Sequence, residues 1–148
     1  MINELSNQVD IPKGESVLAD SQDNIDRLMA GSLEDIVTRM STLASEDAWL
    51  MKARDTFLAG SHISWHLVNI QSQLGTKLSL AECFKWELTA SVNVCAHGDF
   101  CEGVRALLID KDRQPQWRFK DVNSVPTAVL EQIFTSPWGE AHPFSQLS

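Results

Sequence analysis

The feature that most constrains this chain is a helical spacing of apolar residues, which recurs from about Ile25 to Phe134. Apolar residues three and four positions apart form one face of an α-helix, and several of these segments stop at a glycine, a common helix terminator. The stops fall at Gly31, Gly60 and Gly75. No segment shows a convincing period-two alternation; the stretch RFKDVNSV comes nearest to a strand, but it is short and polar. The sequence therefore predicts an all-α fold.

Polar residues mark the expected helix starts, because their side chains can bind the free N–H groups of a first turn. Ser79 and Glu82 give the best-formed signal, a capping box, and we expect a long helix from there to about Cys95. Asp99 and Glu102 repeat the box in acidic form and predict a further helix to about Ile109. Other starts are expected at Ser32 with Asp35, at Ser45, at Ser61 and at about Pro126.

The two ends of the chain differ from this helical region. Residues 1–20 are polar, contain Pro12 and Gly14, and show no sustained period, so we expect a flexible leader there. Residues 136–148 hold two prolines, and we expect an extended tail. The helical domain is accordingly expected to span residues 21–135.

Composition excludes several classes of function. The formal net charge of −8 argues against nucleic-acid binding, which needs a basic footprint. No apolar run approaches the ~20 residues that span a bilayer, and the N-terminus lacks the basic and apolar regions of a secretory signal. We therefore expect a cytoplasmic protein with no membrane partner. The three cysteines include no C-x-x-C pair, so neither a disulfide framework nor a zinc ribbon is expected.

One short segment reverses the acidic balance of the chain. From Arg105 to Lys120 there are five bases and two acids, whereas residues 1–50 hold ten acids and three bases. Such a basic cluster is either solvated surface or the contact site of a phosphate-bearing ligand, and the charge pattern alone leaves both open.

Residues that carry chemistry are scarce. The chain has no glycine-rich phosphate loop, no G-x-S-x-G turn and no H-E-x-x-H motif. His62 and His66 would share a helix face, but with no third ligand nearby they predict no metal site. We predict no catalytic residue. Glu87 borders an apolar stripe and needs a partner; because a short Ala96–Gly98 connection makes two helices neighbours, we expect a partly buried ion pair with Arg105.

The C-terminal half carries a family resemblance. The run GDFCEGVRALLIDKDRQPQW, from Gly98 to Trp117, resembles the C-terminal signature of 3-hydroxyisobutyryl-CoA hydrolases, a branch of the crotonase (enoyl-CoA hydratase/isomerase) superfamily. The upstream SLAECFKWE resembles the preceding helix of that family, and weaker similarity extends back to about Ile25. Two positions depart from the family pattern: His62 stands where proline is common, and Thr89 where arginine is common.

The resemblance implies a division of labour. Members carry their thioester chemistry on an N-terminal core of repeated ββα units, whose N–H groups form the oxyanion hole and whose carboxylates activate water. This chain resembles the helical C-terminal region without that spiral core, and in the superfamily this region closes over the acyl-CoA site and often mediates subunit contacts. We therefore expect little or no catalytic machinery in these 148 residues. The parent enzyme's substrate would be a CoA thioester, and no other cofactor is implied. Lys111 and Arg113, at the rim of the domain, would meet CoA phosphates.

Two hypotheses of function follow. In the first, the chain is a separated or truncated C-terminal domain of an acyl-CoA hydrolase, inactive alone, with hydratase or isomerase chemistry as the nearest enzymatic alternative. In the second, it is a non-catalytic helical module that binds a partner protein. Both predict an exposed apolar surface, which would receive either a crotonase-type core or a second copy of the chain in an oligomer.

Overall fold

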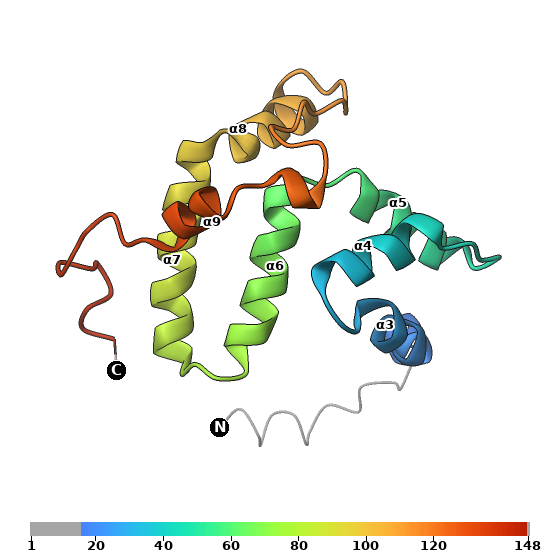
Figure 1. Cartoon of the computed structure of the whole chain (residues 1–148), viewed down its shortest axis with the longest axis horizontal. Helices are drawn as coiled ribbons and strands as arrows, with labels where there is room; N and C mark the ends of the chain where they lie inside the picture. The colour runs from blue at the N-terminus through green and yellow to red at the C-terminus, as the bar shows by residue number, and fades with distance from the viewer. Residues whose placement is uncertain (1–15, 148) are drawn as a thin grey trace, which may run out of the picture. The chain divides into compact units, whose positions relative to one another are not determined.

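The computed structural model describes residues 16–147, and these residues are helices, turns and connecting segments without a strand (Figure 1). The all-α prediction is therefore confirmed for this part of the chain. Two compact units are distinguished, Met1–Thr42 and Leu43–Ser148, where the sequence predicted one helical domain. Residues 1–15 of the predicted leader lie outside the described residues. Val17–Asp20, at the end of the range expected as a leader, form a short helix.

The first unit contains α2 (Val17–Asp20), α3 (Gln22–Met29) and α4 (Leu33–Thr42). The predicted start at Ser32 is confirmed, because the Asp35 N–H donates to the Ser32 hydroxyl while the Asp35 carboxylate accepts from the Ser32 N–H. The Arg39 guanidinium crosses between helices and donates to the carbonyls of Leu28 and Ala30. The buried apolar side chains of α3 and α4 are Leu28, Leu33, Ile36 and Met40.

The second unit begins with α5 (Ala48–Leu58) and α6 (His62–Gly75). Asp47, rather than the predicted Ser45, caps α5, since its carboxylate accepts from two first-turn amides. Ser61 caps α6 as predicted. The Trp65 ring stacks on Phe57, and its indole N–H donates to the Phe57 carbonyl, which joins the two helices.

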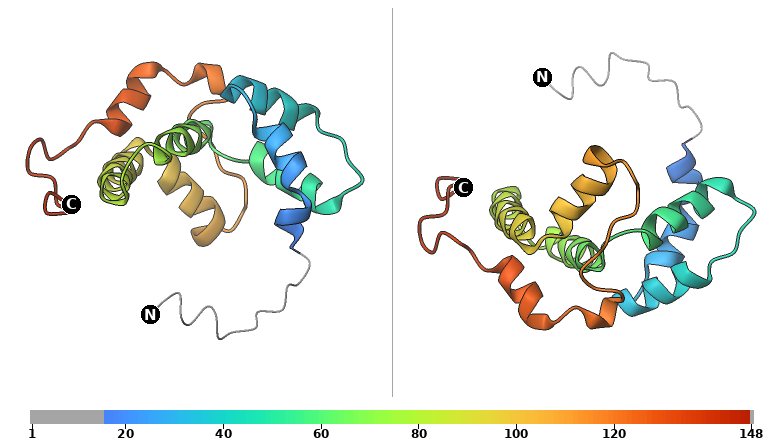
Figure 2. Two further views of the ribbon diagram at one scale, coloured as in Figure 1. Left: turned by 90° about the horizontal axis from the view of Figure 1, so that it is seen from below. Right: turned by 90° about the horizontal axis from the view of Figure 1, so that it is seen from above.

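The long helix α7 (Leu80–His97) runs beside α6 after a short turn (Figures 1 and 2). Its capping box is confirmed, with Ser79 and Glu82 each accepting from the other's backbone N–H. Next follow α8 (Asp99–Val104), the π-helix η1 (Arg105–Ile109), the 3₁₀-helix η2 (Val122–Ser124) and α9 (Thr127–Phe134). Pro126 is the N-cap of α9, close to its predicted position.

The core of the second unit lies where α6, α7 and α9 meet. Ile63 and Ile133 are almost fully buried at its centre, packed with Ala90, Val125 and Val129. Trp86 stacks on Phe134 at 5.1 Å between ring centroids, so α9 is held against α7. Burial of these apolar side chains is the main stabilising contribution to the arrangement.

The C-terminal segment is not extended as predicted, since turns occupy residues 137–140 and 143–146. It is bound to α7 by polar contacts. The Lys85 ammonium donates to the Leu147 carbonyl at 2.7 Å. The His142 ring lies 3.1 Å from the Lys85 carbonyl and 3.4 Å from the Thr89 hydroxyl. Thr89, one of the two departures from the family pattern, is thereby buried under the tail.

Candidate functional site

The segment Gly98–Trp117 folds back on itself. Gly98 leaves α7 with φ of 95°, a backbone conformation that glycine adopts most readily, and α8 starts in a new direction. After η1 the chain runs back along α8 through residues 110–118, called the returning segment, so that the indole of Trp117 lies over Gly103. A Cβ atom at position 103 would stand 3.3 Å from that ring. The indole N–H of Trp117 donates to the Ala59 carbonyl at 2.9 Å, which anchors the returning segment to the end of α5.

The predicted acidic capping box at Asp99 is wrong. Asp99 is the first residue of α8, and its carboxylate makes no capping bond to that helix. Instead the buried Asp99 carboxylate accepts from the Ser61 hydroxyl at 2.5 Å and from the Arg118 N–H at 3.0 Å. One side chain thus joins the start of α6, the start of α8 and the returning segment.

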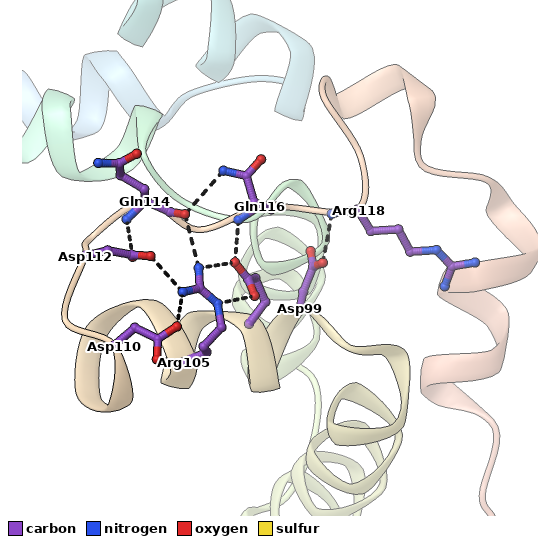
Figure 3. Close-up of polar contacts among 8 residues, drawn as sticks. Asp99, Arg105, Asp110, Asp112, Gln114, Gln116 and Arg118 are labelled. Carbon is purple, nitrogen blue, oxygen red and sulfur yellow. Dashed lines mark hydrogen bonds and ion pairs between the residues drawn. The ribbon is translucent and has the colours of Figure 1, made fainter.

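Arg105, the first residue of η1, is the centre of the ion pairs that join α8 to the returning segment (Figure 3). Its guanidinium contacts Glu102 at 2.8 Å, Asp110 at 2.6 Å and Asp112 at 2.7 Å. It also donates to the Gln114 carbonyl at 3.3 Å. The five N–H donors of a planar guanidinium allow this number of partners.

The predicted ion pair between Glu87 and Arg105 is therefore wrong. Glu87 accepts a 2.6 Å hydrogen bond from the side-chain amide of Gln71 on α6. The physical reason is local: the π-helix and the turn after it bring two carboxylates from positions five and seven residues beyond Arg105. The guanidinium is saturated by these neighbours and by Glu102.

This cluster shifts the pKa values of its members. Hydrogen bonding from Arg105, followed by that from the Gln116 N–H, lowers the pKa of Glu102 to about 2. The pKa of Asp112 is lowered by the Arg105 hydrogen bond and by the Gln114 N–H. The pKa of Arg105 is raised by its three carboxylate partners. All these groups therefore stay charged at neutral pH.

Lys111 and Arg113 alternate with Asp110 and Asp112 in the sequence, but unlike the aspartates they are not ion-paired within the described part of the chain. Both are exposed, and among residues 16–147 neither side chain has a hydrogen-bond or ion-pair partner. Both also have left-handed backbone, with φ of 58° and 56°, which is unfavourable for residues that carry a Cβ. In residues 110–113 (D-K-D-R) the two acids therefore point toward Arg105, whereas the two bases have no partner among the described residues.

The π-helix contributes to this sorting. The Asp110 N–H donates to the Arg105 carbonyl at 2.8 Å, five residues back, whereas in an α-helix it would donate to Ala106. The Ala106 carbonyl accepts instead from the Arg113 N–H at 3.0 Å, and this bond closes the turn that carries both bases.

A large apolar cleft lies between α5 and the α8–η1 segment. It encloses about 1100 Å³, and Arg113, Pro115 and Trp117 line one side of it. Phe100 (54% exposed), Leu107 (62%) and Leu108 (62%) line it, and the next residue, Ile109, is 69% exposed; these four residues are called the exposed apolar face. The tryptophans supply little of this exposed surface, because only Trp49 among the five is exposed.

The described residues do not assemble a metal centre. No group of three or more His, Cys, Asp or Glu within residues 16–147 could hold a metal ion. His66 lies 3.0 Å from the Val122 carbonyl, and His62 packs edge-on against Trp65. Among the helices of the same residues, none combines the length and apolar character that a bilayer crossing requires.

Comparisons with known proteins find similarity to one family. The family model described as enoyl-CoA hydratase/isomerase matches residues 1–134. The mitochondrial 3-hydroxyisobutyryl-CoA hydrolase of Danio rerio is 38% identical over 122 residues, which are 81% of this chain and 31% of that protein. The Dictyostelium discoideum protein of the same name is 31% identical, over 78% of this chain and 30% of its own length.

Two other similar proteins extend the comparison. The small ribosomal subunit protein mS47 of Arabidopsis thaliana is 31% identical over 70% of this chain and 27% of its own length. The crystal structure of an enoyl-CoA hydratase from Rhodobacter sphaeroides 2.4.1 matches with a TM-score of 0.74 and 26% identity, covering 95% of this chain and 43% of that one. The chain thus spans about a third of the length of the hydrolase relatives, and it belongs to the enoyl-CoA hydratase/isomerase family.

Proposed function

We propose that these residues form the helical C-terminal portion of an acyl-CoA thioester hydrolase that resembles 3-hydroxyisobutyryl-CoA hydrolase. The similarity to hydrolase relatives over 81% of this chain supports the proposal. The described residues offer no activated nucleophile and no oxyanion hole, and oxyanion stabilisation is commonly the largest contribution to acyl-transfer catalysis. By themselves the 148 residues would not hydrolyse the thioester.

The exposed apolar face is the part of the proposal that geometry supports best. Exposed large apolar side chains that lie together mark an interaction surface, and here Phe100, Leu107 and Leu108 line the cleft, with the exposed Ile109 next to Leu108 in the sequence. We propose that this face receives a crotonase-type core. The catalytic groups for thioester hydrolysis would then be supplied by the core.

Lys111 and Arg113 are proposed to bind the phosphates of CoA. Both are exposed cations, and Arg113 lines the cleft. Their contribution would be binding energy far from the reacting carbonyl, which enzymes use to hold and orient a substrate.

Complementation tests the proposal. The 148-residue chain is mixed with the part of the Danio rerio hydrolase that lies outside the matched 122 residues, and hydrolysis of 3-hydroxyisobutyryl-CoA is followed by thiol release. The expected result is activity from the mixture and from neither component alone. Leu108→Asp should abolish complementation, whereas Leu80→Asp, at an even more exposed leucine at the start of α7, should not. Turnover by the pure chain that a substitution within it removes would refute the proposal.

A second candidate is a non-catalytic helical module that binds a partner protein. One observation favours it: a relative of this same region is a ribosomal subunit protein by name. The complementation assay separates the candidates. A module of this kind would bind through the exposed apolar face, yet it would restore no thioester hydrolysis to a core.

A further inference from the structure

The alternating charges of residues 110–113 place two carboxylates next to the two cations, and these carboxylates would oppose the binding of an anion. Asp110 and Asp112 are the immediate chain neighbours of Lys111 and Arg113. Free carboxylates at those positions would pair with the cations or repel an incoming anion, since like charges in proximity oppose binding. Lys111 and Arg113 can attract an anion only if another group binds both carboxylates and keeps them away from the two cations.

The Arg105 guanidinium holds both of them. One of its nitrogens donates to Asp110 at 2.6 Å and to Asp112 at 2.7 Å, and Figure 3 shows both carboxylates pointing toward it. Its other two nitrogens donate to Glu102, and one of them also donates to the Gln114 carbonyl at 3.3 Å. Glu102 accepts in turn from the Gln116 N–H at 2.6 Å. The guanidinium is therefore fixed from α8 on one side and from the returning segment on the other.

The backbone adds a second, independent observation. Lys111 and Arg113 adopt left-handed conformations in which glycine would be less strained, and such outliers in a folded protein point to a functional constraint. The retained side chains are both cations, and they flank the sequestered Asp112.

We propose that Arg105 is a positioning residue for an anionic ligand of Lys111 and Arg113, which acts by keeping Asp110 and Asp112 away from the two cations. The inference rests on the proposed function, which supplies a phosphate-bearing ligand as the anion. Arg105 itself need not touch that ligand.

The test measures binding of coenzyme A to the whole 148-residue chain by calorimetry, at low and at moderate salt. The parent should bind, with an affinity that falls as salt rises. The variant Lys111→Gly/Arg113→Gly should lose this binding, because glycine keeps the backbone conformation and removes both charges. Arg105→Gln should weaken binding about tenfold or more, since it releases the carboxylates beside the cations.

A rescue experiment distinguishes this role from a merely structural one. In the Arg105→Gln background, adding Asp110→Asn and Asp112→Asn should restore most of the affinity, because the competing charges are gone. The pair Asp110→Asn/Asp112→Asn in the parent background should keep or raise the affinity. This second variant retains Arg105 and its Glu102 partner, so it gives a result even if Arg105→Gln does not fold.

Three outcomes would overturn the inference: a parent chain that does not bind coenzyme A, an Arg105→Gln variant that binds as tightly as the parent, or an asparagine pair that weakens binding in the parent background. The first outcome leaves the proposed function standing if the complementation assay still yields activity. The two ideas can therefore fail separately.

Discussion

The Ser61 hydroxyl donates a 2.5 Å hydrogen bond to the Asp99 carboxylate, and both groups are buried. The same hydroxyl accepts from the Ser64 N–H in the first turn of α6. A bond between residues thirty-eight positions apart thus fixes the starts of two helices against each other. A buried carboxylate needs its hydrogen-bond donors, because desolvation strongly penalises an unpaired charge.

Loss of the Ser61 donor should therefore destabilise the protein. Ser61→Ala leaves Asp99 with the Arg118 N–H as its remaining hydrogen-bond donor among residues 16–147, and we expect a loss of roughly 2–3 kcal/mol in the free energy of unfolding. Urea unfolding followed by tryptophan fluorescence measures it. Ser64→Ala is the matched control, since Ser64 is exposed and its change should lie within about 0.5 kcal/mol. Equal effects of the two substitutions would contradict the role assigned to Ser61.

Gly103→Ala should also destabilise the protein, by roughly 1 kcal/mol, although alanine is the better helix former. The added methyl group would stand 3.3 Å from the Trp117 ring, which is held in place by its bond to Ala59. Gly75→Ala serves as the control, because no atom lies within 4 Å of its Cβ position at the end of α6. That substitution should be neutral or stabilising by roughly 0.5 kcal/mol. A stabilising Gly103→Ala would show that Trp117 does not pack as described.

The acid stability of the returning segment depends on Glu102. Its pKa is 4.5 as a free side chain and about 2 in the folded protein, so between these values the unfolded state binds more protons than the folded state. The stabilisation by Glu102 is therefore complete above pH 4.5 and is lost as the pH falls toward 2. Thermal melts from pH 6 to pH 2 should show a shallower acid dependence for Glu102→Gln than for the parent. Parallel curves for the two proteins would exclude this linkage.

Relief of backbone strain should make Lys111→Gly and Arg113→Gly stabilising, each by roughly 0.5–1 kcal/mol. The reason is the left-handed φ at both positions, which a glycine adopts without a Cβ clash. Lys120→Gly is the control: Lys120 is an exposed base nearby whose φ is not positive, and its replacement should be destabilising. Thermal unfolding of the three variants checks the order. If Lys111→Gly and Lys120→Gly have the same sign, strain at Lys111 is not significant.

The parts of the fold that followed from sequence depend on contacts between near neighbours. Ser79 and Glu82 satisfy each other's backbone within one turn, and so do Ser32 and Asp35; each start was predictable from four residues. The core residue Ile63 likewise follows from the apolar period of its helix. The capping residues bind within their own helix, and the burial of Ile63 follows from its place on the apolar face of its helix.

The parts that failed depend on partners from other segments. Asp99 stands where a capping residue would, but its carboxylate is taken by Ser61 and Arg118, which no local pattern indicates. Arg105 selects Asp110 and Asp112 because a π-turn bends the chain back, and helical spacing rules extend only to the fourth residue. The bases at Lys111 and Arg113 were visible as an excess of charge, whereas their left-handed backbone was not.

The π-helix at Arg105–Ile109 limits the insertions and deletions that this region tolerates. Because Asp110 donates to the Arg105 carbonyl, the Ala106 carbonyl is left to receive the Arg113 N–H, and the number of residues between these partners is fixed. A deletion of one residue between Ala106 and Arg113 would shift the alternating acids and bases by one position. An aspartate would then face the solvent, and a base would face the Arg105 guanidinium. A scan of one-residue deletions should therefore find this stretch intolerant, whereas the connection at residues 43–46, which lies outside every helix, should accept them.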